Sequence, residues 1–598
     1  MITYILTDRI NKKIARDYSG CFFISHRRLS RREVQLIHEF NFRRMYLSKF
    51  DDLEKEGFYR EFDRFWNELI RDFGPQHVFW RNAVSSKMQE GSQSISYFVL
   101  LLWTLKNIEK KNSFSLVVIC ENVEEVGVFS LWASQNGLKL VRTISWWQLF
   151  SKRISQEFWN LGKFFYFTYL CFKKKRIAPK ISLENFSPMD KRTLVVSEFY
   201  SHSISNGKYQ HPCWGPLYQF FSEQNQKFSI LGDTIDVPSP AIRNDLEAAY
   251  RSFNLFYLYS LVGWWTIIKV SLRVFFRRIS IGPCFFDGCD LAPLVRWHLR
   301  RFNYPFNINA EIFFEGVKRI NQGQFQRMLI TFEDNLFERA CIQAFCALNK
   351  QGVVEGYSHG MICPFNMKLY LTDQEKDRRP QCDRYLTCGD YASKLLSVVA
   401  CRPSQNIISA CTFRSIPIFK YEDLQAHAKD VILVAFDGFY NAAQQFDWLV
   451  ENKEAFGNYR VVLRAHPNVP WEYIFRHSLY ALPEGFEISK EDLKKEFSRT
   501  FCVVYRSASI GLQAVLNGIP AIHMCVDLPL EGDPMYELNQ LKWVVHNSEE
   551  LKKALIQIKE LSVQENEEAR LKATKFAEEY FSPMTEHSIK PFFEWSIK

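Results

Sequence analysis

The sequence lacks several patterns that would assign a function at once. It contains no Cys-x-x-Cys pair, no Gly-x-Gly-x-x-Gly loop and no Walker loop, and its 15 cysteines are scattered along the chain. An odd, dispersed set of cysteines favours free thiols in the cytoplasm and argues against a disulfide framework or a zinc site. Residues 1–13 show no basic region followed by a long apolar core, so we expect no secretory signal.

Size and composition bound what the chain can be. It has 598 residues, of which 47% are hydrophobic, 24% charged and 16% aromatic, so it can bury large cores in two or three domains. Lysine and arginine number 76 against 66 acidic residues, which gives a net charge of +10. This excess is compatible with a polyanion, an anionic membrane or a phosphorylated substrate as partner.

Short apolar runs alternate with helical periodicity in three blocks, which predicts an α/β protein with parallel sheets. Residues 401–423 have little periodicity and are interpreted as the linker between the second and third blocks. The expected division is 1–140 for an accessory N-terminal α/β domain, 141–185 for an amphipathic basic and aromatic segment, 186–410 for the second block and 411–598 for the third.

Two segments, residues 144–180 and 253–280, combine many aromatic side chains with basic ends. Trp and Tyr favour the headgroup level of a bilayer, and Lys and Arg are attracted to anionic lipid. We therefore predict in-plane contact with the inner face of the cytoplasmic membrane; the alternative is a pair of core helices with snorkelling basic ends. A spanning helix is disfavoured because Lys269 and Arg273 interrupt the better candidate.

Three predicted strands of the third block end in polar loops: "FDG" at 436–438, "RAHP" at 464–467 and "YRSAS" at 505–509. The carboxyl edge of a parallel sheet is where α/β proteins place ligands, and a helix N-terminus following the last loop favours a phosphate. The alternatives are an N-capping serine and a strand-end histidine. The candidate ligand contacts are Arg464, His466, Pro467, Arg506, Ser507 and Ser509, with Asp437 and Gly438.

The stretches "RAHP" and "YRSASIGLQAVLNGIPAIHM" resemble the nucleotide-binding half of GT-B glycosyltransferases, two Rossmann-like domains facing a cleft. More narrowly, they are similar to bacterial transferases that use CMP-linked sialic acid or Kdo. The resemblance implies that His466, Pro467, Ser507 and Ser509 bind the nucleotide near its phosphate. No Asp-x-Asp follows a predicted strand, which fits metal-free transfer without a cofactor other than the CMP-linked donor substrate.

The second block resembles a bacterial surface-carbohydrate biosynthesis family through "TFEDNLFERACIQAF", "GVVEGYSHGMICP" and "CDRYLTCGDYASKLL". The residues that carry this likeness are Glu333, Glu338, Ser358–Gly360 and Gly389. A base near the acceptor hydroxyl needs a pKa raised toward neutrality by partial burial. Glu333 at a strand end fits that need, Asp334 is the substitute and His359 is the alternative. For Glu338 and Arg339 we favour structural roles, as a helix-start charge and an ion pair.

These observations predict a cytoplasmic, peripherally membrane-associated glycosyltransferase of bacterial lipopolysaccharide or capsule assembly. Its donor would be a nucleotide sugar, an acidic sugar linked to CMP, and its acceptor a glycan or a lipid-linked glycan. The alternatives are a CDP-polyol phosphotransferase of the teichoic-acid type and a non-catalytic polysaccharide assembly or export protein. Nucleic acid is not expected as a partner, because the basic residues cluster with aromatics and not along one groove.

Overall fold

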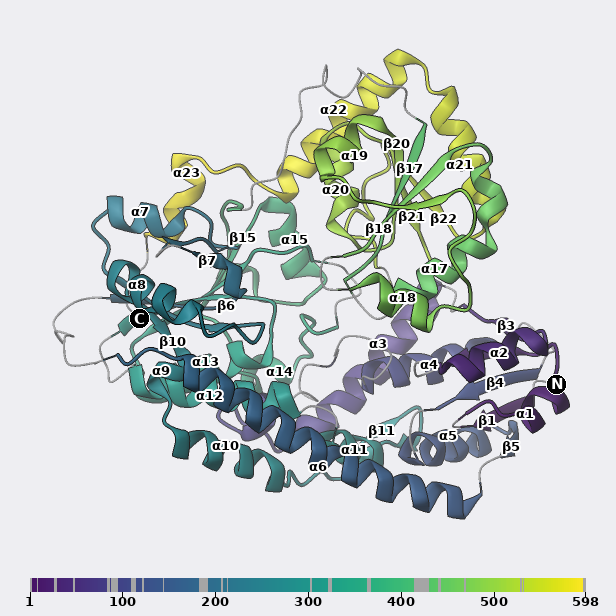
Figure 1. The fold of residues 1–598 in the computed structure, drawn as a ribbon, viewed down its shortest axis with the longest axis horizontal. Coiled ribbons are helices and arrows are strands. Elements are labelled where there is room, and N and C mark those ends of the chain that lie inside the picture. The colour runs from purple at the N-terminus through teal and green to yellow at the C-terminus, as the bar shows by residue number, and fades with distance from the viewer. Residues whose placement is uncertain are drawn as a thin grey trace.

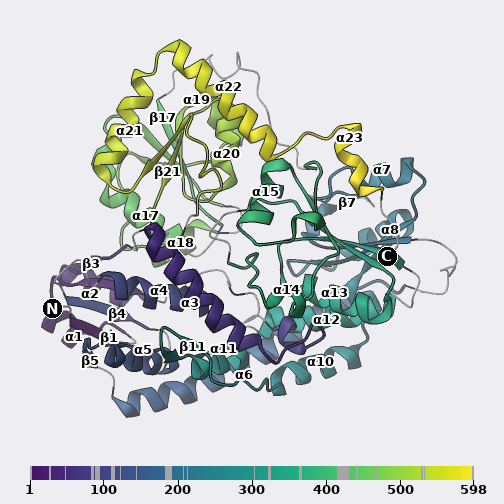
Figure 2. The ribbon, with the colours of Figure 1, turned by 180° about the vertical axis from the view of Figure 1, so that it is seen from behind.

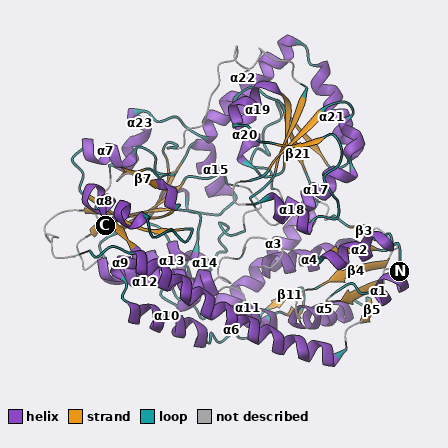
Figure 3. Ribbon diagram, viewed as in Figure 1, coloured by secondary structure: helices purple, strands orange, loops and turns teal. Residues whose placement is uncertain are grey.

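Three parallel β-sheets organise the computed structural model, and helices flank each of them (Figures 1 and 3). The structure describes residues 3–594 apart from 8, 26–28, 47–48, 83–86, 88–94, 109–114, 121–122, 143–144, 182–191, 206–207, 212, 302–303, 321–324, 363–366, 414–429, 439–441, 467–468, 527–529 and 531. The α/β fold with two Rossmann-like sheets and an additional N-terminal sheet, predicted from the sequence, is confirmed.

The first sheet has five strands in the order β3-β2-β4-β1-β5. Its central strands are short runs of β-branched and aromatic residues, such as "SLVVI", that are buried on both faces. The strands are β1 (Thr3–Thr7), β2 (Phe22–Ser25), β3 (Arg43–Arg44), β4 (Ser115–Ile119) and β5 (Lys139–Arg142). The helices are α1 (Lys12–Asp17), α2 (Arg31–Glu39), α3 (Asp52–Ile70), α4 (Ile95–Ile108) and α5 (Val123–Gln135).

The second sheet has seven strands in the order β10-β9-β6-β13-β14-β15-β16. The strands are β6 (Arg192–Phe199), β9 (Phe228–Thr234), β10 (Leu255–Tyr257), β13 (Phe325–Thr331), β14 (Val353–Ser358), β15 (Arg384–Thr387) and β16 (Ile407–Ser409). The helices are α7 (Leu217–Glu223), α8 (Ile242–Phe253), α9 (Leu258–Leu261), α12 (Tyr304–Ile320), α13 (Leu336–Leu348), α14 (Glu375–Arg378) and α15 (Asp390–Val398). Strand β16 lies inside the predicted linker: its three residues pair in parallel with β15, so a short edge strand forms without a periodic pattern.

The third sheet has six strands in the order β19-β18-β17-β20-β21-β22. The strands are β17 (Val431–Ala435), β18 (Arg460–Arg464), β19 (Phe486–Ile488), β20 (Thr500–Tyr505), β21 (Ala521–Met524) and β22 (Lys542–Val545). The helices are α17 (Ala442–Glu451), α18 (Trp471–His477), α19 (Leu493–Arg499), α20 (Ser509–Leu516), α21 (Ser548–Glu560) and α22 (Val563–Tyr580).

Two segments pack away from their neighbours in sequence. Residues 281–299, with strands β11 (Phe285–Phe286) and β12 (Cys289–Asp290) and the start of helix α11 (Ala292–Arg301), join the core of the first sheet. Helix α23 (Glu586–Ile589) and the turn after it return from the third-sheet domain to the second: Arg327 Nη1 donates to the carbonyl of Phe592 at 2.6 Å. The packed units therefore exchange segments that are distant in sequence.

Helices α6 (Trp146–Ile177) and α10 (Trp264–Phe276) run along one side of the molecule. Figures 1 and 2 show both helices at the lower edge, on the side away from the third sheet. Ser145 caps α6 through a capping box with Gln148, which fixes where this 32-residue helix begins. Among the described residues, none of the helices combines the length and apolarity that crossing a bilayer requires.

Candidate active site

Three acid–base side chains lie at the carboxyl edge of the second sheet. Glu198 is the last residue but one of β6, Glu333 follows β13 by two residues, and His359 directly follows β14. Because β6, β13 and β14 are neighbours and all parallel, their carboxyl ends meet at one edge. Glu333 and His359, the two strand-end positions that the sequence indicated, are thus brought together.

Glu333 and His359 form a carboxylate–imidazole pair. Glu333 Oε1 lies 3.3 Å from His359 Nε2, and Asn335 Nδ2 donates to Glu333 Oε2 at 3.4 Å. The Glu333 side chain is 48% exposed, whereas that of His359 is 6% exposed. The carboxylate is therefore the group that a substrate can reach, and the imidazole lies behind it. Gly360 does not have a left-handed backbone, so no positive-φ turn is involved in presenting the His359 ring.

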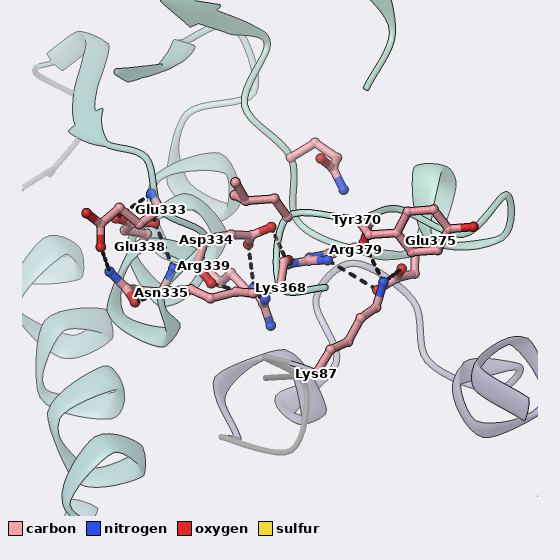
Figure 4. Close-up of polar contacts among 12 residues, drawn as sticks. Lys87, Glu333, Asp334, Asn335, Glu338, Arg339, Lys368, Tyr370, Glu375 and Arg379 are labelled. Atoms are coloured by element: carbon pink, nitrogen blue, oxygen red, sulfur yellow. Dashed lines mark hydrogen bonds and ion pairs between the residues drawn. The ribbon is translucent and has the colours of Figure 1, made fainter. Parts of the chain in front are cut away.

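Glu338 and Arg339 have the structural roles favoured from the sequence. The Glu338 carboxylate accepts from the backbone N–H groups of Glu333 and Asn335, at 3.1 and 2.8 Å, and completes the capping box of α13. Burial raises the pKa of Glu338 to about 8, and Glu333 adds to the shift while Lys368 opposes it. Figure 4 shows this cap next to Glu333.

Asp334, the substitute base, is ruled out by its surroundings. Burial alone would raise its pKa, but three guanidinium groups more than reverse this and hold the pKa below the usual range. Arg339 Nε lies 2.7 Å and Arg402 Nη2 2.6 Å from the carboxylate, and Arg379 is the third partner. Figure 4 shows Asp334 pointing away from Glu333 toward this cluster. A carboxylate locked in its ionised form cannot take a proton near neutral pH.

Two further acid–base residues at this edge of the second sheet were not predicted from the sequence. Burial and the nearby Asp233 raise the pKa of Glu198 to about 7, and Asn309 Nδ2 donates to its Oε1 at 2.7 Å. Burial lowers the pKa of His211 to about 4; its Nε2 lies 2.8 Å from Ser197 Oγ. Glu198 ends an apolar run, "RTLVVSEF", as Glu333 does, so the same signal could have found it. His211 follows strand β8 (Lys208–Tyr209), whose two residues carry too little pattern to give such a signal.

At the carboxyl edge of the third sheet, Asp437 and Arg506 form a buried pair. Arg506 Nη1 lies 3.2 Å from Asp437 Oδ2, and the Asp437 carboxylate also accepts from the backbone N–H of Ser507 at 3.0 Å and from Gln445 Nε2 at 2.6 Å. Arg506 Nε donates to the carbonyl of Val526. Because both side chains are buried and paired with each other, they hold the strand-end loops together; their contact with a ligand stays a prediction.

His466 and Gly438 lie against each other. A Cβ added at Gly438 would approach the His466 ring to 3.0 Å, so the glycine lets the ring lie directly on the loop after β17. Burial lowers the pKa of His466, with Asp437 opposing. The ring is therefore a neutral hydrogen-bonding group at neutral pH.

The other predicted contacts differ in their surroundings. Arg464 Nη1 donates to the carbonyl of Glu491 at 2.9 Å and to Ser489 Oγ at 3.2 Å, on the β19 side of the sheet. Pro467 lies outside the described residues. Ala508 occupies the N-cap of α20 and makes no side-chain cap, so neither Ser507 nor Ser509 is the capping serine of the alternative interpretation.

The second and third sheets meet through elements that follow the carboxyl ends of their strands. Lys394 in α15, the helix after β15, pairs at 2.7 Å with Glu537 in the loop after β21. A Cβ at Gly389 would lie 2.5 Å from the carbonyl oxygen of Glu579, so this glycine allows the end of α22 to pack against the start of α15. In the described part of the chain, no group of His, Cys, Asp and Glu side chains is arranged to hold a metal ion.

Comparisons with known proteins find fold-level similarity alone. No family model matches the sequence, and no curated protein matches it. Among solved structures, a putative UDP-N-acetylglucosamine 2-epimerase from Listeria monocytogenes is 13% identical with a TM-score of 0.35, and the alignment covers 66% of this chain and 93% of that one. The glycosyltransferase of kitacinnamycin is 13% identical with a TM-score of 0.36 (66% and 97% covered).

UDP-GlcNAc 2-epimerase from Neisseria meningitidis, solved with UDP-GlcNAc bound, is 11% identical with a TM-score of 0.35 (63% and 94% covered). At TM-scores below 0.5 these similarities carry no argument about activity. The function of this chain is therefore argued from its own residues.

Proposed function

We propose that this chain is a GT-B glycosyltransferase that transfers a sugar from a CMP-linked donor, an acidic sugar, to a glycan or lipid-linked acceptor in bacterial surface polysaccharide assembly. The observation that carries the proposal is the Glu333–His359 pair at the carboxyl edge of one parallel sheet. A second parallel sheet presents its own carboxyl edge, with His466 and the α20 N-terminus. The scattered cysteines favour the cytoplasm as the site of the reaction.

The acceptor hydroxyl would bind at the second sheet and lose its proton to Glu333 as it attacks the anomeric carbon. His359 holds the carboxylate in place from behind and stabilises its charge; the proton ends on Glu333 and the nucleotide leaves with the bonding electrons. Glu198, whose raised pKa makes it a proton carrier near neutrality, lies at the same edge and is a second candidate for proton exchange.

The donor would bind at the third sheet. The neutral ring of His466 can hydrogen-bond the nucleotide, and the amides at the start of α20 favour its phosphate. The Asp437–Arg506 pair fixes the two loops between which these groups lie. The pair acts by positioning, because its charges are already matched.

A thermal-shift screen against CMP, CDP, UDP and GDP tests the donor assignment, because a ligand that binds only the folded protein raises its stability by mass action. We expect cytidine nucleotides to stabilise the protein most, and His466→Ala to remove the difference. His546→Ala, an exposed histidine before α21, is the matched control and should change nothing. A preference for UDP or GDP would refute the CMP assignment, and a requirement for CDP-linked polyols would favour the phosphotransferase.

A further inference from the structure

Helices α6 and α10 share an exposed apolar surface, here named the α6–α10 face. The helices lie against each other through Phe164 and Phe275, whose ring centroids are 4.6 Å apart, and through Phe172 and Trp264, 5.5 Å apart. Large side chains nevertheless point to solvent from both helices: Trp147 on α6 is 80% exposed and Phe276 on α10 is 70% exposed. Exposed apolar patches of this kind mark interaction sites.

Beside Trp159, Tyr166 and Tyr169, which are also exposed, six apolar side chains on α6 form one stripe along the helix. Their spacing is three or four residues throughout, which at about 100° per residue places them on one side of the helix. They extend over about 27 Å at a rise of about 1.5 Å per residue. Another side of α6, about 100° around the helix axis from the stripe, is buried against the protein through Asn160, Phe164 and Cys171. The stripe consists of Trp147, Phe150, Ile154, Phe158, Leu161 and Phe165.

The charges on the α6–α10 face are almost all positive. Glu157 is the one acidic residue in the sequences of α6 and α10, which hold nine lysines and arginines. Three lysines lie beside aromatic rings: Lys163 is 5.6 Å from the Trp159 ring centroid, Lys173 5.0 Å from Tyr169, and Lys269 5.6 Å from Trp265. Such Trp/Lys and Tyr/Lys pairs suit the headgroup level of a bilayer, where the ring is apolar and the ammonium meets lipid phosphate.

The basic run at the end of α6 is only partly available. Lys174 Nζ pairs with Asp233 at 2.8 Å, and Lys175 Nζ donates to the carbonyl of Tyr259 at 2.8 Å. Burial lowers the pKa of Lys175. Of the four residues 173–176, Lys173 and Arg176 are the exposed ones. Neutralising all four residues would therefore disturb the core, so a charge variant of this face should leave Lys174 and Lys175 in place.

We propose that the α6–α10 face docks in the plane of an anionic lipid bilayer, with the stripe at the boundary between headgroups and acyl chains. An exposed apolar stripe, with lysines beside other exposed aromatics of the same face, matches a surface that is flat, negatively charged and apolar inside. A spanning orientation is not available, since no described helix is long and apolar enough. The docking does not depend on the proposed transfer reaction.

Vesicle co-sedimentation of the full chain tests this, with phosphatidylcholine vesicles with and without phosphatidylglycerol. The charge variant is Lys163→Gln/Lys173→Gln/Lys269→Gln, whose matched control on α21 and α22 is Lys552→Gln/Lys553→Gln/Lys572→Gln. At about fivefold in affinity per lysine, we expect a loss of about 10²-fold for the charge variant on anionic vesicles and none for its control.

The apolar variant is Trp147→Gln/Phe158→Gln/Phe165→Gln, and its control is Ile556→Gln/Leu571→Gln, which are also exposed. We expect the apolar variant to lose binding by more than about tenfold on both vesicle types, and its control to bind normally. Unchanged binding by both face variants, or no binding of the wild type to anionic vesicles, overturns the proposal. A dimer that the apolar variant dissociates, without vesicle binding, would assign the face to a second copy.

Discussion

Replacing Glu333 by Gln removes a proton acceptor while keeping shape and hydrogen bonding. The side chain is 48% exposed, and its contacts to His359 and Asn335 are 3.3 and 3.4 Å long, so the variant should fold normally. A positioned general base contributes about 10²–10⁴-fold to turnover, or about 3–5 kcal/mol of activation free energy. We expect a loss of that size with donor affinity nearly unchanged, because the nucleotide groups belong to the other sheet.

The assay is single-turnover sugar transfer at saturating donor, in a double-mutant cycle with His359→Ala. If the two residues act as a pair, the double variant should lose little more than Glu333→Gln alone. Glu247→Gln, an exposed carboxylate on α8, is the matched control. Near-normal turnover of Glu333→Gln with an inactive His359→Ala would refute the assignment; His359 would then be the base and Glu333 a well-placed strand end.

Two further predictions concern stability. Asp334→Ala leaves buried arginines without their counter-charge and should lower the free energy of unfolding by about 3–5 kcal/mol in a denaturation experiment. Asp373→Ala, which breaks an exposed ion pair, is the control and should cost less than about 1 kcal/mol. Equal costs would contradict the argument from buried charge. Burial lowers the pKa of Lys87 to about 8, below its usual ~10.5, so the unfolded chain binds more protons between these values and stability should rise with pH there. Lys87→Met should flatten that rise in melting temperatures recorded from pH 7.5 to 10.5, and an unchanged slope would contradict it.

The sheets were predictable because their strands are continuous apolar runs with turn residues after them. "VILVA" and "RMLIT" are buried strands in the structure, as the pattern indicates. Strand β16 was not predictable, since three residues carry too little pattern and gain their conformation from pairing with β15. The exchange of segments 281–299 and 586–592 was also invisible, because long-range packing leaves no periodic signal.

The site was predictable in position and less so in chemistry. Strand ends in a parallel sheet share an edge, so Glu333 and His359 could be placed together from sequence order. The order of residues in the sequence could not show which charged side chains are paired within the protein. Asp437 and Arg506 end different strands, and their pairing depends on the sheet order, in which β17 and β20 are neighbours. Asp334 differs from Glu333 in being buried and in the three arginines that reach it from later segments.

The network around Asp334 also gives the N-terminal block a physical role. Asp334 binds Arg379, Arg379 binds Glu375, and Glu375 binds the buried Lys87 of the first block (Figure 4). Two residues of α3 contact the segment just before Glu375: Asp63 accepts from Tyr370 Oη at 2.9 Å, and Asn67 accepts from Thr372 Oγ1 at 2.6 Å.

Buried charge pairs are costly to break, so this chain of contacts fixes Asp334 in the turn between Glu333 and helix α13. The first sheet thus contributes to the site without lining it. Its helix α3 and Lys87 hold the arginine cluster, the cluster holds Asp334, and Asp334 fixes the backbone from which Glu333 projects. These contacts predict that substitutions in the first block that break them lower turnover by displacing Glu333. Nucleotide binding at the third sheet should stay intact.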